Sequence, residues 1–161
     1  MENLNLVSII YIICLIIISA ILSGSETSIT SIRKSKIHKL ANKGDRNALR
    51  VLKLIEKKND LVSSILVGNN FVNILASALA TAILIKFYGD DGVIYSTIVM
   101  SVLIVIFAEI LPKNIALLKP DRYALTLSFI LTLFLKIFSP FVYIIKKFNL
   151  LIFKIFNIEK Q

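Results

Sequence analysis

The sequence of 161 residues lacks most of the side chains that common enzymes and metal centres use. It contains one cysteine, Cys14, and one histidine, His38, which excludes a disulfide framework, a thiolate metal site and a multi-histidine metal site. Only five glycines and three prolines are present, which argues against a loop-rich β-protein. No Ser-His-Asp set, zinc-protease motif or phosphate-binding loop occurs, so we do not expect an enzyme.

Apolar side chains are what the chain has in excess. Hydrophobic residues make up 57% of the sequence and charged residues 18%, whereas soluble domains are usually about 45–50% apolar. A soluble core of this length cannot bury so much apolar surface, and a disordered chain would contain far less of it. The composition therefore predicts one small all-α domain that is integral to a membrane.

The spacing of the charges locates the membrane-spanning helices. Residues 3–25, 61–85 and 92–108 carry no charge over 23, 25 and 17 positions, and a spanning helix needs about 20 mostly apolar residues. The first run follows Glu2 rather than a basic residue and is too long for the core of a typical signal peptide, so we expect it to be retained. The three predicted transmembrane helices cover residues of about 4–28, 61–86 and 92–112.

Basic residues concentrate between the first two predicted spans. Residues 33–58 hold ten of the nineteen Lys and Arg, and such segments normally stay in the cytoplasm. We therefore expect an outside N-terminus and a cytoplasmic C-terminus. This topology explains the charge without a nucleic-acid partner. Apolar residues recur in the segment at helical spacing on both sides of Gly44 and Asp45, which predicts a helical hairpin packed under the bundle or on the membrane lipid. Its predicted apolar stripe comprises Ile37, Leu40, Ala41, Ala48, Leu49, Leu52 and Ile55.

The last apolar region, residues 123–161, differs from the other three. Lys136 interrupts it and lysines alternate with aromatic residues, as in helices at the headgroup boundary. We predict juxtamembrane interfacial or re-entrant helices, broken near Ser139 and Pro140 because proline lacks the amide donor. The alternative is a fourth span in which Lys136 extends towards the headgroups.

Two polar clusters interrupt the first two apolar runs, where each polar group costs free energy unless it is paired or faces water. Ser23 and Ser25 flank Gly24, and the alternative interpretation of this cluster is a helix-packing patch of small residues. In the second run Asn70, Asn73 and Ser77 follow Asn69 and share one helix face. An interhelical hydrogen-bond seam is the alternative there.

A third polar cluster closes the last span. Glu109 is its carboxylate, and Pro112 cannot donate to the carbonyl of Ala108. The alternative is an ion pair between Glu109 and Lys113, which would explain the charge but not the unpaired carbonyl of Ala108. The three clusters together supply hydroxyl, amide and carbonyl oxygens with one carboxylate. Such hard donors suit Mg²⁺, Ca²⁺ or Na⁺ and disfavour Zn²⁺.

Three ordered motifs carry a family resemblance: SGSET at 23–27, GNNFVN at 68–73 and EILPK at 109–113, with the basic hairpin between the first two. The chain resembles the transmembrane domain of the CNNM/CorC magnesium transporters over nearly its whole length. The resemblance implies a homodimer with three spans per subunit and a cytoplasmic belt of juxtamembrane helices. It also implies export of Mg²⁺ driven by Na⁺ influx.

Carried over by motif position, the implied Mg²⁺ ligands are Ser23, Asn73, Glu109 and a backbone carbonyl near Ala108, a position that is often glycine in relatives. Further oxygen groups are implied to support these ligands or to bind Na⁺. They belong to Ser25, Asn69, Asn70 and Ser77. Family members usually continue into paired cytoplasmic CBS domains, which this chain lacks, so we expect an excised membrane domain. The competing hypothesis is a membrane scaffold or cation-sensing subunit that binds a cation without moving it.

Overall fold

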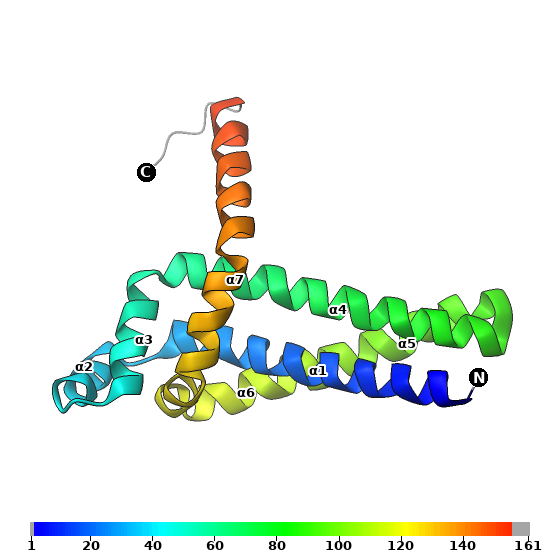
Figure 1. Cartoon of the computed structure of the whole chain (residues 1–161), viewed down its shortest axis with the longest axis horizontal. Coiled ribbons are helices and arrows are strands. Elements are labelled where there is room, and N and C mark those ends of the chain that lie inside the picture. Colours follow the sequence, from blue (N-terminus) through cyan, green and yellow to red (C-terminus); the bar gives the residue numbers. More distant parts are fainter. Residues whose placement is uncertain (1, 156–161) are drawn as a thin grey trace.

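The computed structural model describes the backbone of residues 2–155 and the side chains of residues 6–148. Within these residues every regular element is helical, which confirms the all-α prediction (Figure 1). The elements, in chain order, are α1 (Glu2–Ser31), α2 (Lys34–Asn42), α3 (Arg46–Glu56), α4 (Lys58–Tyr88), η1 (Gly89–Asp91), α5 (Gly92–Leu103), η2 (Ile104–Ile110), α6 (Leu111–Leu118) and α7 (Pro120–Ile155).

Three helical stretches of the described chain are long and apolar enough to cross a membrane: Leu6–Ser31, Lys58–Leu118 and Pro120–Phe148. The middle stretch reverses direction at Gly89, whose φ of +61° favours glycine. It thus contains two antiparallel arms, α4 and the continuous run from α5 through η2 to α6, which lie alongside α1 (Figure 1). The chain is therefore a multi-pass α-helical membrane protein.

Large apolar side chains cover the outside of this bundle. Ile10, Ile74 and Ile98 are 53%, 70% and 59% exposed and lie on α1, α4 and α5. Such exposure is unfavourable in water and neutral in hydrocarbon. The outward faces of the three arms are therefore suited to contact lipid or another membrane helix.

The basic segment folds into the predicted helical hairpin, α2 and α3. Asp45 caps α3 by accepting hydrogen bonds from the backbone N–H groups of Asn47 and Ala48 at 2.8 and 3.0 Å. The buried stripe differs partly from the prediction, because Leu49 is 46% exposed while Val51 and Leu54 are buried. The hairpin's side of the membrane stays a prediction. Its buried side chains pack with Leu61 of α4 and with Ala124 and Leu131 of α7 in one core.

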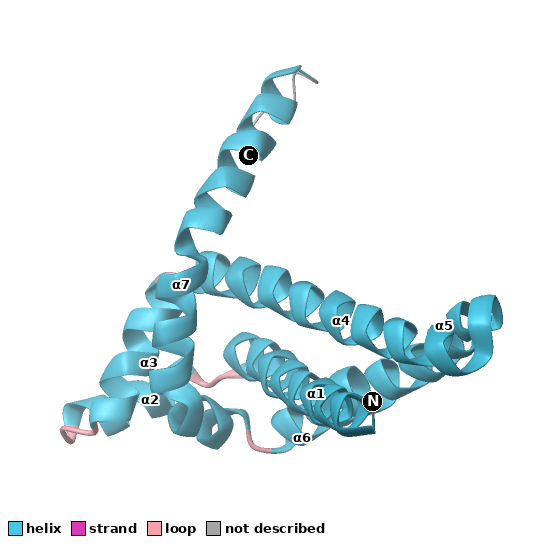
Figure 2. Cartoon of the chain, turned by 45° about the vertical axis from the view of Figure 1, so that its right-hand side comes forward, coloured by secondary structure: helices cyan, strands magenta, loops and turns pink. Residues whose placement is uncertain are grey.

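The predicted break near Ser139 and Pro140 is wrong: α7 is one helix that continues through Pro140. A proline removes a single hydrogen bond, so a helix can bend there instead of ending. The ribbon of α7 does change direction along its length (Figure 2). Much of α7 runs across the direction shared by α1 and α4 (Figure 1), which favours the interfacial interpretation; that location stays a prediction. Of the predicted region, residues 156–161 lie outside the described residues.

An ion-pair cluster fixes the start of α7 to the connection between α1 and α2. Asp121, only 3% exposed, accepts hydrogen bonds from the backbone N–H, Nε and a terminal guanidinium nitrogen of Arg33 at 2.9–3.1 Å. Lys36 adds an ion pair at 3.2 Å. Nearby, the Ser28 hydroxyl donates to the carbonyl of Pro120 at 2.7 Å. These bonds hold the hairpin and α7 against the same end of α1.

We expect Asp121→Ala to destabilise the protein by about 2–3 kcal/mol, because it removes several charge-assisted hydrogen bonds at once. The measurement is thermal unfolding in mild detergent, followed by far-UV circular dichroism. Asp90→Ala is the matched control, since Asp90 is an exposed aspartate at the opposite end of the bundle. Equal midpoints for the two variants would contradict this role of Asp121.

Candidate cation site

Helix α1 contacts the other two arms of the bundle and is their common neighbour. Towards α4, the buried Ser19 hydroxyl donates to the side-chain oxygen of Asn69 at 2.6 Å. The packing shows the relative direction of α1 and α4. Later residues of α1, Leu22 and Ile29, share a core with Leu61 and Ile65 near the beginning of α4. Earlier residues of α1, such as Ile12, pack against later residues of α4, Ala76 and Ala80. The two helices therefore run antiparallel.

Two contacts join α1 to α6. A Cβ added at Gly24 would lie 3.2 Å from the carbonyl oxygen of Pro112 and 2.4 Å from the hydroxyl of Tyr123, so the missing side chain permits this close approach. Beside this contact, Lys113 forms an ion pair with Glu26 at 3.7 Å. The structure thus contradicts the alternative in which Lys113 pairs with Glu109.

Glu109 lies in a π-helical turn, η2, that the sequence analysis did not foresee. The N–H of Leu111 donates to the carbonyl of Ile106, five residues back, and Pro112 follows with no N–H to donate. Such turns are rare and often occur at functional sites. Ala108 is fully buried and Glu109 partly buried. Within the described part of the chain, the Glu109 carboxylate has no hydrogen bond or ion pair.

The register between the helices places Glu109 close to the level of the first motif. α1 and the α5–α6 arm run in the same direction, and Gly24 lies beside Pro112. Counting back three residues on each helix puts Glu109 level with about residue 21 of α1, at a rise of 1.5 Å per residue. Glu109 therefore lies between the levels of Ser19 and Ser23.

The serines of the first motif differ in how their hydroxyls are satisfied. Ser25 donates to the carbonyl of Ile21 at 2.6 Å, so its hydroxyl is bonded to its own helix. Ser23 is fully buried, and its hydroxyl has no hydrogen-bond partner in the described structure. A buried hydroxyl without a partner costs about 1–3 kcal/mol. Ser23 is therefore the serine of this motif that is available to a ligand.

The asparagines of the second motif do not converge on Ser23. Asn70 is exposed and Asn73 is partly buried. Because α1 and α4 are antiparallel, Ser23 and Asn73 lie on opposite sides of the bond between Ser19 and Asn69. Four residues on each helix separate them by about 12 Å along the bundle. The register places Ser23, Ala108 and Glu109 within about one helical turn of one another along the bundle, close to the bonded pair Ser19 and Asn69. The ligand set stays a prediction.

Ser77, another predicted support residue, lies further along α4. It lines a cavity of about 300 Å³ between α4 and α5 together with Thr81 and Ser96. The hydroxyls of Thr81 and Ser96 lie 2.8 Å apart and hydrogen-bond to each other. This pair is an interhelical hydrogen bond of the kind weighed for the second motif, as is the bond between Ser19 and Asn69.

Ser19 and Glu26 are the residues of this region that sequence reasoning missed. Ser19 sits four residues before Ser23, on the same face of a helix. This spacing could have indicated that Ser19 belongs with Ser23. A single serine within an apolar run is common, however, and does not by itself indicate a site. Glu26 and Lys113 are 87 positions apart, and no local pattern links them.

The fold and this cluster define a multi-pass membrane protein with oxygen groups gathered between its spans. The chain belongs to the family described as the Cyclin M transmembrane N-terminal domain, CNNM, whose sequence profile matches residues 9–161. It is 39% identical over 142 residues to the UPF0053 inner membrane protein YfjD of Escherichia coli, covering 88% of this chain and 33% of that protein.

Two relatives from Haemophilus influenzae extend the comparison. A UPF0053 protein is 42% identical over 146 residues, covering 91% of this chain and 34% of its own length. A protein named "Polyamine export protein" is 30% identical over 165 residues, covering 94% of this chain and 38% of its own length. The chain spans about a third of the length of the curated relatives it matches.

Proposed function

We propose that this chain is the membrane domain of a transporter that exports Mg²⁺ in exchange for Na⁺ influx. The observation that carries the proposal is the pairing of two unsatisfied groups. The buried Ser23 hydroxyl and the Glu109 carboxylate lie at about the same level of the bundle, each without a partner in the described structure. A hard cation bound between them would satisfy both groups.

The composition of the site favours a small ion over a long organic cation. Glu109 is the one carboxylate in the cluster, and the other candidate ligands are neutral oxygen groups. A polyamine carries several separated charges, each of which needs an acceptor. One carboxylate with neutral oxygens binds a divalent ion weakly enough to release it, which transport requires.

The proposed assembly is a homodimer with an outside N-terminus, as the family resemblance implies. Ala76 and Ala80, two of the small residues on α4, already pack in the chain's own core. Residues on the other face, such as Phe71 and Ile74, are 62% and 70% exposed and are available to a second copy or to lipid. Downstream cytoplasmic domains would provide regulation in the whole protein.

The test is Mg²⁺ flux from proteoliposomes with and without an opposed Na⁺ gradient. We expect flux that depends on the gradient and that falls at least about tenfold in Ser23→Ala. Thr97→Val is the control, because the Thr97 hydroxyl is exposed and bonds to its own helix through the Val93 carbonyl. Saturable Mg²⁺ binding without flux would favour the cation-sensing hypothesis. Flux of spermidine but not of Mg²⁺ would refute Mg²⁺ as the cargo.

A further inference from the structure

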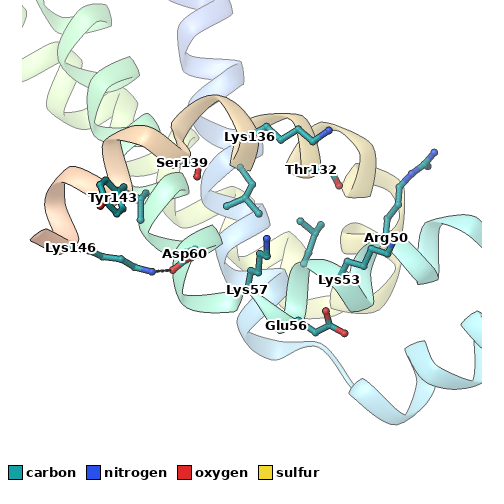
Figure 3. Close-up of a pocket in the computed structure, with 13 residues that line it drawn as sticks. Arg50, Lys53, Glu56, Lys57, Asp60, Thr132, Lys136, Ser139, Tyr143 and Lys146 are labelled. Atoms are coloured by element: carbon teal, nitrogen blue, oxygen red, sulfur yellow. Dashed lines mark hydrogen bonds and ion pairs between the residues drawn. The ribbon is translucent and has the colours of Figure 1, made fainter. Parts of the chain in front are cut away.

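A second cavity lies away from the candidate cation site, between α3, the beginning of α4 and α7 (Figure 3). Its volume is about 600 Å³. Five basic side chains line it against two acidic ones, Glu56 and Asp60. The basic residues are Arg50, Lys53, Lys57, Lys136 and Lys146. The cavity therefore concentrates positive charge that the chain only partly neutralises.

Four of the five basic side chains have no acidic partner among the described residues. Lys146 forms an ion pair with Asp60 across the cavity (Figure 3), and Arg50 bonds to the side-chain oxygen of Asn47 at 2.8 Å. Lys53, Lys57 and Lys136 form no side-chain hydrogen bond or ion pair within the described residues. These three exposed lysines place positive charge around one cavity, where they would attract an anion.

The cavity also has apolar walls. Leu54 and Val142 are almost fully buried behind it, and Leu135 of α7 contributes to the same lining. A purely aqueous anion gains nothing from such walls. An amphiphile with an anionic head and an acyl tail would satisfy both the lysines and the leucines.

The position of the cavity matches the headgroup level of a membrane. Lys57 and Asp60 lie immediately before Leu61, where the uncharged run of α4 begins. The boundary between charged and apolar residues marks the edge of the hydrocarbon. Lys136 is the one charged residue between positions 123 and 145, and its cost there is reduced if its ammonium group meets a lipid phosphate.

We propose that this cavity binds the phosphate headgroup of an anionic phospholipid, with Lys53, Lys57 and Lys136 as the recognising residues. Lysine serves as a point charge for phosphate, and basic pockets between membrane helices suit anionic headgroups. The bound lipid would join α3, α4 and α7, reinforcing the ion pair between Lys146 and Asp60.

The test compares lipid retention by the purified full chain in native mass spectrometry. The chain is exchanged into mixed micelles that contain equal amounts of phosphatidylglycerol and phosphatidylcholine. We expect the wild type to retain phosphatidylglycerol at least about tenfold over phosphatidylcholine. The combined variant Lys53→Gln, Lys57→Gln and Lys136→Gln loses this preference.

The matched control is the combined variant Lys39→Gln, Lys43→Gln and Arg46→Gln. It removes three charges from the same hairpin outside the cavity, so it should retain the preference. An equal loss in both variants would show surface attraction only and overturn the site. No preference in the wild type would also overturn it. Displacement of the lipid by millimolar inorganic phosphate would refute lipid as the occupant. Circular dichroism of each variant checks that the helices are intact.

Discussion

Glu109→Gln is expected to abolish the Na⁺-dependent Mg²⁺ flux while leaving the fold intact. Glutamine keeps the size of the side chain and one carbonyl oxygen but removes the negative charge, which is the one charge in the cluster opposing the cation. Loss of supporting groups around a metal commonly costs 10–100-fold in affinity or activity, so we expect a decrease of at least about 100-fold for the carboxylate itself. The measurement is gradient-driven Mg²⁺ flux in proteoliposomes at matched protein content.

The matched control is Glu26→Gln, the same substitution on the neighbouring helix. Glu26 is the partner of Lys113, with 23% of its side chain exposed and the ammonium group 3.7 Å away. Such a partly exposed pair contributes little stability, about 0–1 kcal/mol. Glu26→Gln should therefore retain most of the flux. If the two variants lose flux equally, Glu109 has no special role and the candidate site is wrong.

The spans and the hairpin follow from local properties of the sequence. Uncharged runs of 17–25 residues can be counted directly, and helical periodicity around Gly44 and Asp45 predicts α2 and α3. Leu49 was nevertheless assigned to the wrong face. Periodicity identifies an apolar stripe but does not identify the neighbouring helix that packs on it. In the structure Val51 and Leu54, rather than Leu49, are buried in the core that includes residues of α7.

The candidate site was only partly predictable, because it depends on register between helices. The motifs identified Ser23, Ala108 and Glu109, but not that the antiparallel direction of α1 and α4 separates Ser23 from Asn73. The partner of Lys113 was not predictable for the same reason: the alternative i, i+4 pair with Glu109 is visible in the sequence, whereas the contact with Glu26 is not. Pro112 signalled an irregularity in the third span, and only the structure shows that it is a π-helical turn.

Gly68→Ala is expected to disrupt the contact between α4 and α7. A Cβ at this position would lie 2.1 Å from the Cζ atom of Phe134, closer than atoms can approach. The clashing atom is at the tip of the Phe134 ring, which stacks on Phe138 with the centroids 4.3 Å apart, so relief of the clash requires the ring to move against this stacking. Alanine favours a helix over glycine by about 1 kcal/mol, whereas overpacking costs about 1–3 kcal/mol. We therefore expect net destabilisation of Gly68→Ala, because the cost of the clash exceeds the gain in helix propensity.

A second substitution separates the clash from a general effect on α4. Phe134→Leu in the Gly68→Ala background removes ring atoms from the space that the new methyl group occupies. We expect the double variant to be more stable than the sum of the single effects by about 1–2 kcal/mol, a coupling typical of residues in contact. Thermal unfolding in detergent measures all three variants. Ala78→Val is the control, because Ala78 lies on the exposed face of the same helix.

The same contact links packing to the candidate site. Gly68 immediately precedes Asn69, whose side chain accepts the hydrogen bond from Ser19. A shift of α4 away from Phe134 would therefore move Asn69 relative to α1, and it would change the surroundings of Ser23 one turn away. We expect Gly68→Ala to lower Mg²⁺ flux and Phe134→Leu to restore part of it. Restored stability without restored flux would show that the ring itself, rather than the position of α4, is required.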